Sequence, residues 1–340
     1  MSEPTADSTD AEPTAAEIPA ATAETPADNA ADSAAADSAA ADTAVVATPA
    51  ADAPAAGPAL DPPTTEIPAA ELAALADRAV VVSRDEEDPA VAVLTFNRPA
   101  RYNALTTELK DAVLAAVLRL EADDSIRALV LTGAGKAFCV GQDLGEHAAA
   151  LADDPATAFD TVERHYNPIV LGLLDLPFPV IAAINGPCAG AGLGFALACD
   201  LRVAAAGLKF TTAFTGIGLT ADSGLSASLA HAVGVSRATE LLLLNETFTA
   251  EDAASWGLVS SVVPAEEVLP AALVLARRLA AGPTKAYVEV KRAVRRGAVS
   301  AMPDVLAAEG AAQARLAATS DHVDAVADFL AKRRPTFQGK

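Results

Sequence analysis

Basic residues are missing from the start of this sequence. Arg78 is the first Lys or Arg of the chain, whereas thirteen of the 45 acidic residues lie before Pro68. The net charge is −21, and the remaining 32 acidic residues against 24 basic ones account for only about −8 of it. A stretch made mostly of Ala, Thr, Asp, Pro and Glu has too little apolar surface to offset the entropy of ordering. We predict that residues 1–70 form a disordered acidic tail, which either solubilises the chain or docks on a partner.

Other absences exclude several kinds of segment and partner. A secretory signal needs a basic start and an apolar stretch, and a mitochondrial presequence is rich in Arg; the tail has neither feature. The sequence also contains no uninterrupted apolar run of the roughly eighteen residues that a membrane-spanning helix needs. The acidic balance argues against nucleic acid as a partner. We therefore expect a cytoplasmic protein that binds neither membrane nor nucleic acid.

Cysteine is scarce as well. The three cysteines, Cys139, Cys188 and Cys199, are too few and too unsuitably spaced for a disulfide framework or a zinc site. All three stand in apolar surroundings, where a free thiol packs like a small apolar side chain. The sequence predicts no metal site.

From about residue 78 onward the pattern is that of an α/β protein. Thr106 is a candidate N-cap for a helix, because apolar residues with helical spacing follow it, from Leu109 to Leu120. Further helices are expected at residues 155–174 and 191–199 and over most of the chain after Leu219. Short apolar runs predict strands at residues 80–83, 90–96, 127–132, 179–184, 201–204, 208–211 and 260–263. Alternating strands and helices predict a mixed or parallel sheet with helices on its faces.

Three glycine-containing segments are the candidates for chemistry. They are residues 136–144 (KAFCVGQDL), 185–200 (NGPCAGAGLGFALACD) and 214–225 (FTGIGLTADSGL). The run GAGLG at residues 190–194 does not have the spacing G-x-G-x-x-G, nor does it lie in the first strand–turn–helix unit, so dinucleotide binding is not predicted. Glycines at a strand-to-helix turn instead free backbone N–H groups at a helix N-terminus, where a negatively charged oxygen is favoured.

Two of these segments, together with AVLTFNRPARYNAL at residues 92–105, resemble the signature stretches of the crotonase (enoyl-CoA hydratase/isomerase) superfamily. The second segment extends in this comparison to residues 183–205, AINGPCAGAGLGFALACDLRVAA, and the likeness runs in order from about Val80 to Phe337. The resemblance implies a ClpP-like spiral of β-β-α turns over residues 78–265 and a helical region over residues 266–340 for oligomerisation or for covering the site. It implies homotrimers or hexamers and an acyl-CoA substrate, with coenzyme A as part of the substrate and no other cofactor.

The resemblance also implies an oxyanion hole built from two backbone N–H groups. The motif positions assign these groups to Gln142, which follows Gly141, and to Ala191, which follows Gly190. Such donors stabilise the enolate oxygen more than the ground-state oxygen, and each is commonly worth roughly 3 kcal/mol. The residues expected to contact the acyl-CoA around these donors are Val140, Gly141, Asp143, Leu144, Gly190 and Phe214. Asp143 is also expected to fix the turn around the first donor. The alternative is that both positions are ordinary tight turns.

The candidate acid–base residue separates members of this superfamily. Hydratase members use two glutamates, and the matching positions here are Gly194 and Phe214. Asp222 instead matches the acid of isomerase members that act on enoyl-CoA or 1,2-epoxyphenylacetyl-CoA. An apolar wall of Phe214, Leu219 and Leu225 would raise the pKa of Asp222 toward neutrality. The alternative role for Asp222 is the N-cap of a helix that begins near Ser223.

Three functions follow as alternatives. We predict an acyl-CoA isomerase with Asp222 as acid and base, with coenzyme A held by Arg101 and by Lys332, the latter by reaching a neighbouring subunit. A hydratase that obtains its second acid elsewhere is the second alternative, and a coenzyme A-binding or scaffold protein without turnover is the third.

Overall fold

The structure, a computed structural model, describes residues 79–340, which belong to a single unit of the chain. The predicted acidic tail, residues 1–70, lies outside the described residues. The boundary predicted at residue 265 stays a prediction. Within residues 79–340, none of the helices combines the length and apolar character that crossing a membrane requires.

The main sheet has the strand order β1-β2-β3-β4-β6-β9. Its strands are β1 (Val80–Arg84), β2 (Val91–Phe96), β3 (Ala128–Gly133), β4 (Val180–Ile184), β6 (Leu201–Ala205) and β9 (Ser261–Val263). β1 and β2 form an antiparallel hairpin, whereas the other neighbours pair in parallel. Every residue of β3 and β4 is buried, which explains why their sequences are continuous apolar runs. The predicted mixed sheet is confirmed.

A second, smaller sheet has the order β5-β7-β8. It consists of β5 (Cys188–Ala189), parallel to β7 (Lys209–Thr211), which is antiparallel to β8 (Phe248–Thr249). Phe210 and Phe248 stack across it with ring centroids 5.2 Å apart. β8 was not predicted from the sequence, because a strand of two residues carries no periodicity.

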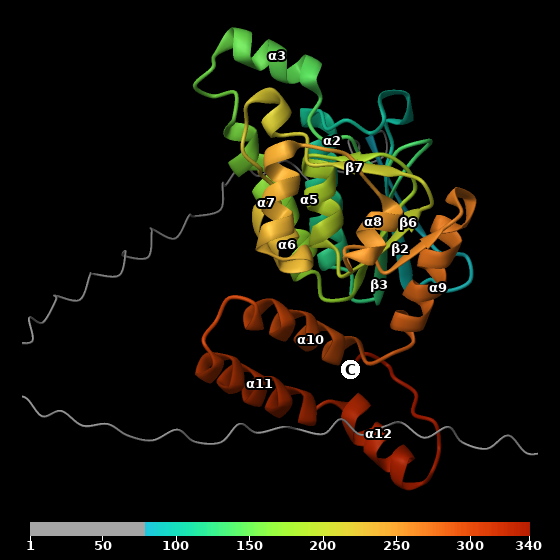
Figure 1. Cartoon of the computed structure of the whole chain (residues 1–340). Coiled ribbons are helices and arrows are strands. Elements are labelled where there is room, and N and C mark those ends of the chain that lie inside the picture. The colour runs from blue at the N-terminus through green and yellow to red at the C-terminus, as the bar shows by residue number, and fades with distance from the viewer. Residues whose placement is uncertain (1–78) are drawn as a thin grey trace, which may run out of the picture. The chain divides into compact units, whose positions relative to one another are not determined.

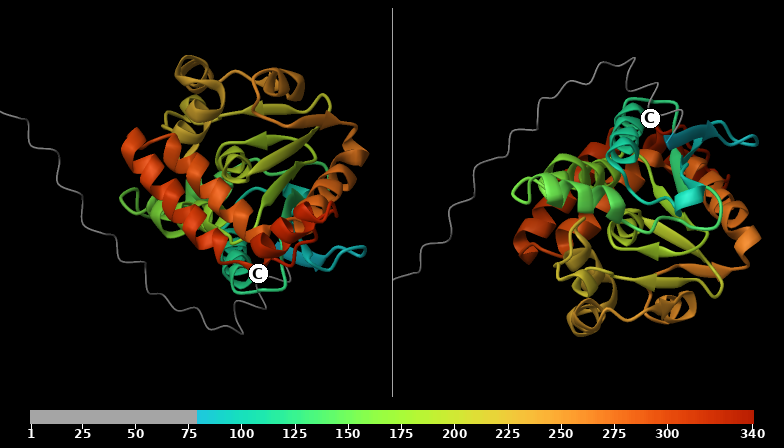
Figure 2. Two further views of the ribbon diagram at one scale, coloured as in Figure 1. Left: turned by 90° about the horizontal axis from the view of Figure 1, so that it is seen from below. Right: turned by 90° about the horizontal axis from the view of Figure 1, so that it is seen from above.

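Helices pack against the main sheet and against one another (Figures 1 and 2). α2 (Thr107–Glu121) begins after the predicted cap, since the Leu109 N–H donates to Thr106 Oγ1 at 3.3 Å. α2 packs on α4 (Asn167–Asp175), which also contacts the fully buried α5 (Ala191–Ala198). α9 (Val268–Ala280) packs against β3, β4 and β6. The chain between β7 and α9 is mostly helical, as predicted, with α6 (Leu225–Val233), α7 (Val235–Leu244) and α8 (Ala250–Ser255).

The C-terminal region consists of α10 (Thr284–Gly297), α11 (Met302–Ala317) and α12 (Ser320–Leu330). Hydrogen bonds join it to the residues just before β3 and β6: Arg127 donates to Thr284 Oγ1 at 3.0 Å, and Lys291 donates to Asp200 at 2.7 Å. Asp200 also accepts from the Val180 N–H at 2.8 Å, which agrees with a structural role for this carboxylate.

The start of one predicted helix is wrong, and one helix was not predicted. The helix expected at residues 155–174 begins at Asp160, continues through a π-helical turn at η2 (Val162–Tyr166) and ends with α4. Residues 144–153, for which no helix was predicted, form α3 (Leu144–Asp153). No residue of α3 is buried, so packing on the core does not impose the apolar periodicity by which a helix is predicted. Short 3₁₀ turns complete the description at η1 (Pro99–Arg101), η3 (Thr215–Ile217) and η4 (Ala265–Glu267).

Candidate functional site

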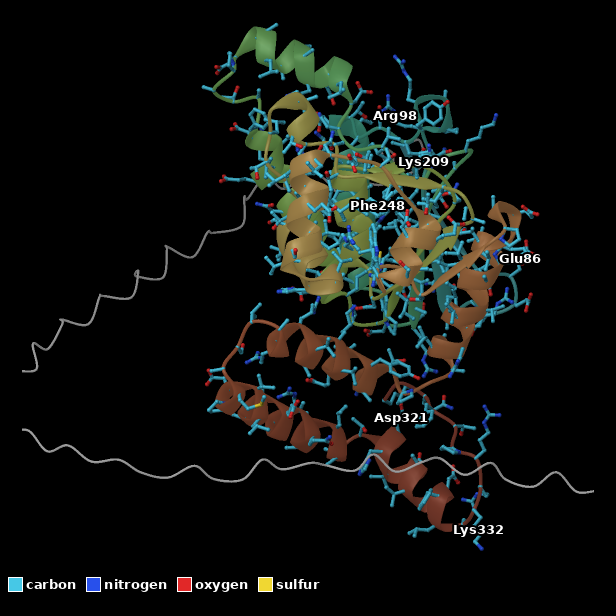
Figure 3. All side chains as sticks on the ribbon, in the orientation of Figure 1. Glu86, Arg98, Lys209, Phe248, Asp321 and Lys332 are labelled. Carbon is cyan, nitrogen blue, oxygen red and sulfur yellow. The ribbon has the colours of Figure 1, made fainter. Side chains whose placement is uncertain are left out.

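A cavity of about 630 Å³ collects almost all of the predicted site residues. Segments from β2–α2, β3–α3, β5–α5 and the chain after β7 line it. The predicted residues among its lining are Arg101, Val140, Gly141, Gln142, Asp143, Leu144, Gly190, Ala191, Phe214 and Asp222. Lys332 is not among them; it follows α12 and lies well apart from Arg98 (Figure 3). Its contribution from a neighbouring subunit stays a prediction.

The backbone around Gln142 is held by Leu105. The Leu105 N–H donates to the Gly141 carbonyl at 2.8 Å, and the Asp143 N–H donates to the Leu105 carbonyl at 3.1 Å. In a parallel bridge of this kind, the residue between the two bonded residues points its own N–H away from the partner segment. Here that residue is Gln142, and its N–H points away from Leu105. Among the described residues, the Gln142 N–H donates to no protein acceptor. It is available to a ligand.

The second N–H group lies close to the first loop. Gly190 has φ +54°, a left-handed conformation that favours glycine, and Ala191 is the first residue of α5, where an N–H has no acceptor within the helix. A side chain on Gly141, whose φ is +84°, would meet the Ala189 carbonyl at 3.1 Å and the Ala191 nitrogen at 3.4 Å. Two glycines thus bring to one wall of the cavity two N–H groups that find no acceptor in the part of the chain described here. This arrangement suits an oxygen that gains negative charge.

Asp222 contributes a carboxylate to the same cavity. Burial raises its pKa, and this effect is opposed by a hydrogen bond from Ser223 Oγ, 2.8 Å long, and by the charge of Lys110. The capping alternative is wrong, because α6 begins at Leu225 after Gly224 and no side chain caps it. Of the expected apolar wall, Phe214 and Leu219 line the cavity, whereas Leu225 is buried outside its lining.

Ser223, which follows Asp222 in the chain, fills the space next to Gly194. A Cβ on Gly194 would meet Ser223 Cβ at 2.5 Å and the Ser223 carbonyl oxygen at 2.9 Å. Ser223 is buried and adopts φ +52°, so its backbone is held in a conformation that few residues other than glycine adopt. A side chain at position 194 would displace the segment that carries Asp222.

The other acidic residues near the cavity have structural partners. Asp143 is the N-cap of α3, accepting from the Gly145 and Glu146 N–H groups at 3.1 and 3.2 Å, and it pairs with Arg98 at 3.4 Å. The backbone hydrogen bond from Glu146, together with Arg98, holds the pKa of Asp143 below its usual value despite partial burial. Glu146 itself accepts from the Thr107 N–H at 2.8 Å. Asp222 is the one carboxylate in the cavity lining, within residues 79–340, that no backbone N–H or basic group binds.

Sequence reasoning missed a polar cluster behind Gln142. Its carboxamide oxygen Oε1 accepts from Lys110 Nζ at 3.2 Å and from the Tyr166 hydroxyl. Lys110 Nζ also donates to Thr161 Oγ1 at 2.5 Å. The signal was present: Lys110 lies between Leu109 and Val113 on the buried side of α2, where a lysine is unusual.

No group of three or more His, Cys, Asp or Glu side chains that could hold a metal ion occurs within residues 79–340. The cysteines are free and buried, and burial raises the pKa of Cys139 to about 12. A reactive thiolate is therefore not a feature of this site.

Comparisons with known proteins agree on one family. The family model described as enoyl-CoA hydratase/isomerase matches residues 86–340. The 1,2-epoxyphenylacetyl-CoA isomerase of Escherichia coli (strain K12) is 39% identical over 253 residues, which cover 74% of this chain and 97% of that protein. A probable enoyl-CoA hydratase of Rhodobacter capsulatus is 39% identical over 258 residues, 76% of this chain and 98% of that protein. A crystal structure of an enoyl-CoA hydratase/isomerase from Mycobacterium abscessus has a TM-score of 0.73 and 50% identity, covering 77% of this chain and 100% of that one.

Proposed function

Because this chain belongs to the enoyl-CoA hydratase/isomerase (crotonase) family, we propose that it moves a double bond within an acyl-CoA thioester. Asp222 is the acid and base, and the N–H groups of Gln142 and Ala191 are the oxyanion donors. The observation that carries this proposal is the half-buried carboxylate of Asp222, which Ser223 Oγ but no described backbone N–H or basic group binds, in a cavity with two N–H groups that have no acceptor among the described residues.

The proposed reaction conserves every atom of the substrate. The Asp222 carboxylate removes a proton from C2 of a 3-enoyl thioester, and the electron pair moves into the thioester carbonyl to give a dienolate. The enolate oxygen then accepts hydrogen bonds from Gln142 and Ala191. The protonated Asp222 returns the proton to C4, which leaves the double bond between C2 and C3. A raised pKa suits a group that must take up and release the same proton near neutral pH.

The space around Gly194 supports isomerisation over hydration. Adding water needs a group that positions and deprotonates it, and the resemblance places the two hydratase glutamates at Gly194 and Phe214. Ser223 fills the space next to Gly194, and Phe214 is buried and apolar. Hydration is the second candidate function because the Rhodobacter capsulatus relative is named a probable hydratase.

The substrate class has two candidates within this proposal. A 3-enoyl-CoA fits the single acid–base group, and the Escherichia coli relative is named for isomerisation of 1,2-epoxyphenylacetyl-CoA. Arg101 is proposed to bind a phosphate of coenzyme A, since it is exposed at the cavity. The reaction needs only proton transfer, so no cofactor beyond the coenzyme A of the substrate is proposed. We also propose that the reaction takes place in the cytoplasm.

The test is product analysis by chromatography and mass spectrometry after incubation with a medium-chain 3-enoyl-CoA. A conjugated 2-enoyl-CoA of unchanged mass is expected from the wild type and from the control Asp124→Asn, an exposed residue, but not from Asp222→Asn. A product heavier by one water would establish hydration instead. Turnover that survives in Asp222→Asn would refute the assigned role. Absence of turnover with both the 3-enoyl and the ring-epoxide thioesters would favour a protein that binds acyl-CoA without reaction.

A further inference from the structure

A buried lysine without an ion pair lies behind the oxyanion loop. Lys110 is only 1% exposed, yet within the part of the chain that the structure describes its Nζ bonds to neutral oxygens, those of Gln142 and Thr161. The same Nζ lies 5.3 Å from the centroid of the Tyr166 ring. Burying an ammonium without a carboxylate partner costs folding stability. Folding stability therefore does not explain why a lysine is buried here. Its position directly behind the oxyanion loop points to a role in the site.

Lys110 touches the residue that presents one oxyanion donor. The Gln142 side chain is held at its far end by two donors, Lys110 Nζ and the Tyr166 hydroxyl, so the Gln142 peptide is fixed from both sides. Tyr166 lines the substrate cavity, whereas Lys110 lines a neighbouring cavity of about 410 Å³. Lys110 thus acts from behind the site without lining the substrate cavity.

We propose that Lys110 is a positioning residue: it clamps the Gln142 side chain so that the Gln142 N–H stays aimed at the enolate oxygen, and it places a positive charge behind that oxygen. Preorganised charge of this kind stabilises a developing anion without reorganisation during the reaction. The inference rests on the proposed isomerase function.

The same charge acts on Asp222. Burial raises the pKa of Asp222, and the Ser223 hydrogen bond and the charge of Lys110 oppose that rise. Burial lowers the pKa of Lys110, whereas Glu146, Asp111 and Asp222 favour its charged form. Tyr166 is the other titratable group coupled to Asp222, and burial keeps its hydroxyl protonated. Removing Lys110 should raise the pKa of Asp222, so the acidic limb of the kcat profile should move to higher pH.

The experiment compares Lys110→Met with Lys291→Met. Lys291 is another largely buried lysine, but it bonds to Asp200 and to the Phe178 carbonyl, away from the cavity. We expect Lys110→Met to lower kcat by about tenfold to a hundredfold, less than the loss of an oxyanion donor itself. KM should stay within about twofold, because the interaction strengthens in the transition state. Lys291→Met should keep kcat and the pH profile. A folded Lys110→Met with wild-type kcat and an unshifted acidic limb would overturn the proposal.

A double-mutant cycle separates the clamp from other effects. Gln142→Met removes the acceptor but keeps the backbone N–H, so adding Lys110→Met to it should cost less than adding Lys110→Met to the wild type. Equal costs would overturn the clamp. If Lys110→Met fails to fold, Gln142→Met alone decides: a lower kcat supports the clamp and a wild-type kcat overturns it. If Asp222→Asn keeps its activity, the isomerase mechanism is refuted. If Asp222→Asn loses activity but Lys110→Met keeps the wild-type kcat and pH profile, only the inference about Lys110 is refuted.

Discussion

At the scale of single residues, the proposed preference for isomerisation over hydration rests on the close approach of Gly194 to Ser223. The Cβ that any other residue would add at position 194 meets Ser223 backbone, which a small rotation cannot move away. We predict that Gly194→Glu abolishes isomerisation without producing hydration, because the new side chain displaces Asp222 before it can position water. The measurement is product analysis with both a 3-enoyl-CoA and a 2-enoyl-CoA.

Gly297→Glu is the matched control for that substitution. It adds the same carboxylate at an exposed position of α10 where a Cβ would meet nothing within 4 Å. It should retain isomerase activity. Hydration of a 2-enoyl-CoA by Gly194→Glu would contradict the steric argument. It would show that the segment carrying Asp222 can move to accommodate the glutamate side chain.

A second prediction at this scale concerns stability against pH. The pKa of Asp222 is raised in the folded chain, so the native state binds its proton more tightly than the unfolded state. Folding stability is therefore lost as pH rises from the unfolded pKa through the folded pKa. Asp222→Asn should melt at a higher temperature than the wild type at pH 7, and the difference should shrink toward pH 3. Equal melting temperatures at pH 7, measured by calorimetry, would show that burial of the charge costs nothing.

The sequence predicted the residues that local motifs carry and missed one that the packing creates. Gln142, Ala191 and Asp222 come from three segments far apart in the chain, and the structure brings them to one cavity. Lys110 was missed because its role depends on contacts with Gln142, Thr161 and Tyr166, which arise only when α2 packs beside η2. No spacing rule within α2 encodes those partners.

At the scale of elements, structure set by neighbouring residues was predicted correctly, whereas structure set by contacts between distant residues was not. The start of α2 was predicted because its cap lies next to it in sequence. α3 was not predicted as a helix, although Asp143 caps it, because none of its residues is buried in the core. β8 exists because Phe248 pairs with Phe210 of β7, which is a contact between distant parts of the chain.

One element-scale prediction tests how the C-terminal segment is held to α12. Asp321 is buried and accepts from the Gln338 and Gly339 N–H groups at 2.6 and 2.9 Å. Asp321→Ala should leave these two N–H groups without their acceptor and should cost about 1–3 kcal/mol of the free energy of unfolding. Asp324→Ala, an exposed position on the same helix, is the control and should stay within about 0.5 kcal/mol of the wild type. Denaturant unfolding measures both, and equal values would show that Asp321 does not hold the segment.

At the scale of the whole molecule, the C-terminal helices carry apolar side chains that no part of the described chain covers. These exposed residues are Val290, Val294, Met302, Leu306, Val323, Val326, Phe329 and Leu330. Many large apolar side chains exposed on neighbouring helices are typical of a protein interface. We propose that it joins copies of this chain into a homotrimer or hexamer, as the family resemblance suggests.

The corresponding prediction is made for mass in solution. Light scattering after gel filtration should give three or six times the 34.2 kDa of one chain. Phe329→Glu combined with Leu330→Glu should reduce that mass, because these side chains are 80% and 77% exposed in a single chain and a carboxylate there would be desolvated in an interface. Leu118→Glu, at an exposed apolar position on α2, is the control and should leave the mass unchanged. If the double variant also lost activity toward the enoyl-CoA, the predicted role of Lys332 across the subunit boundary would gain support; full activity in a monomer would remove it.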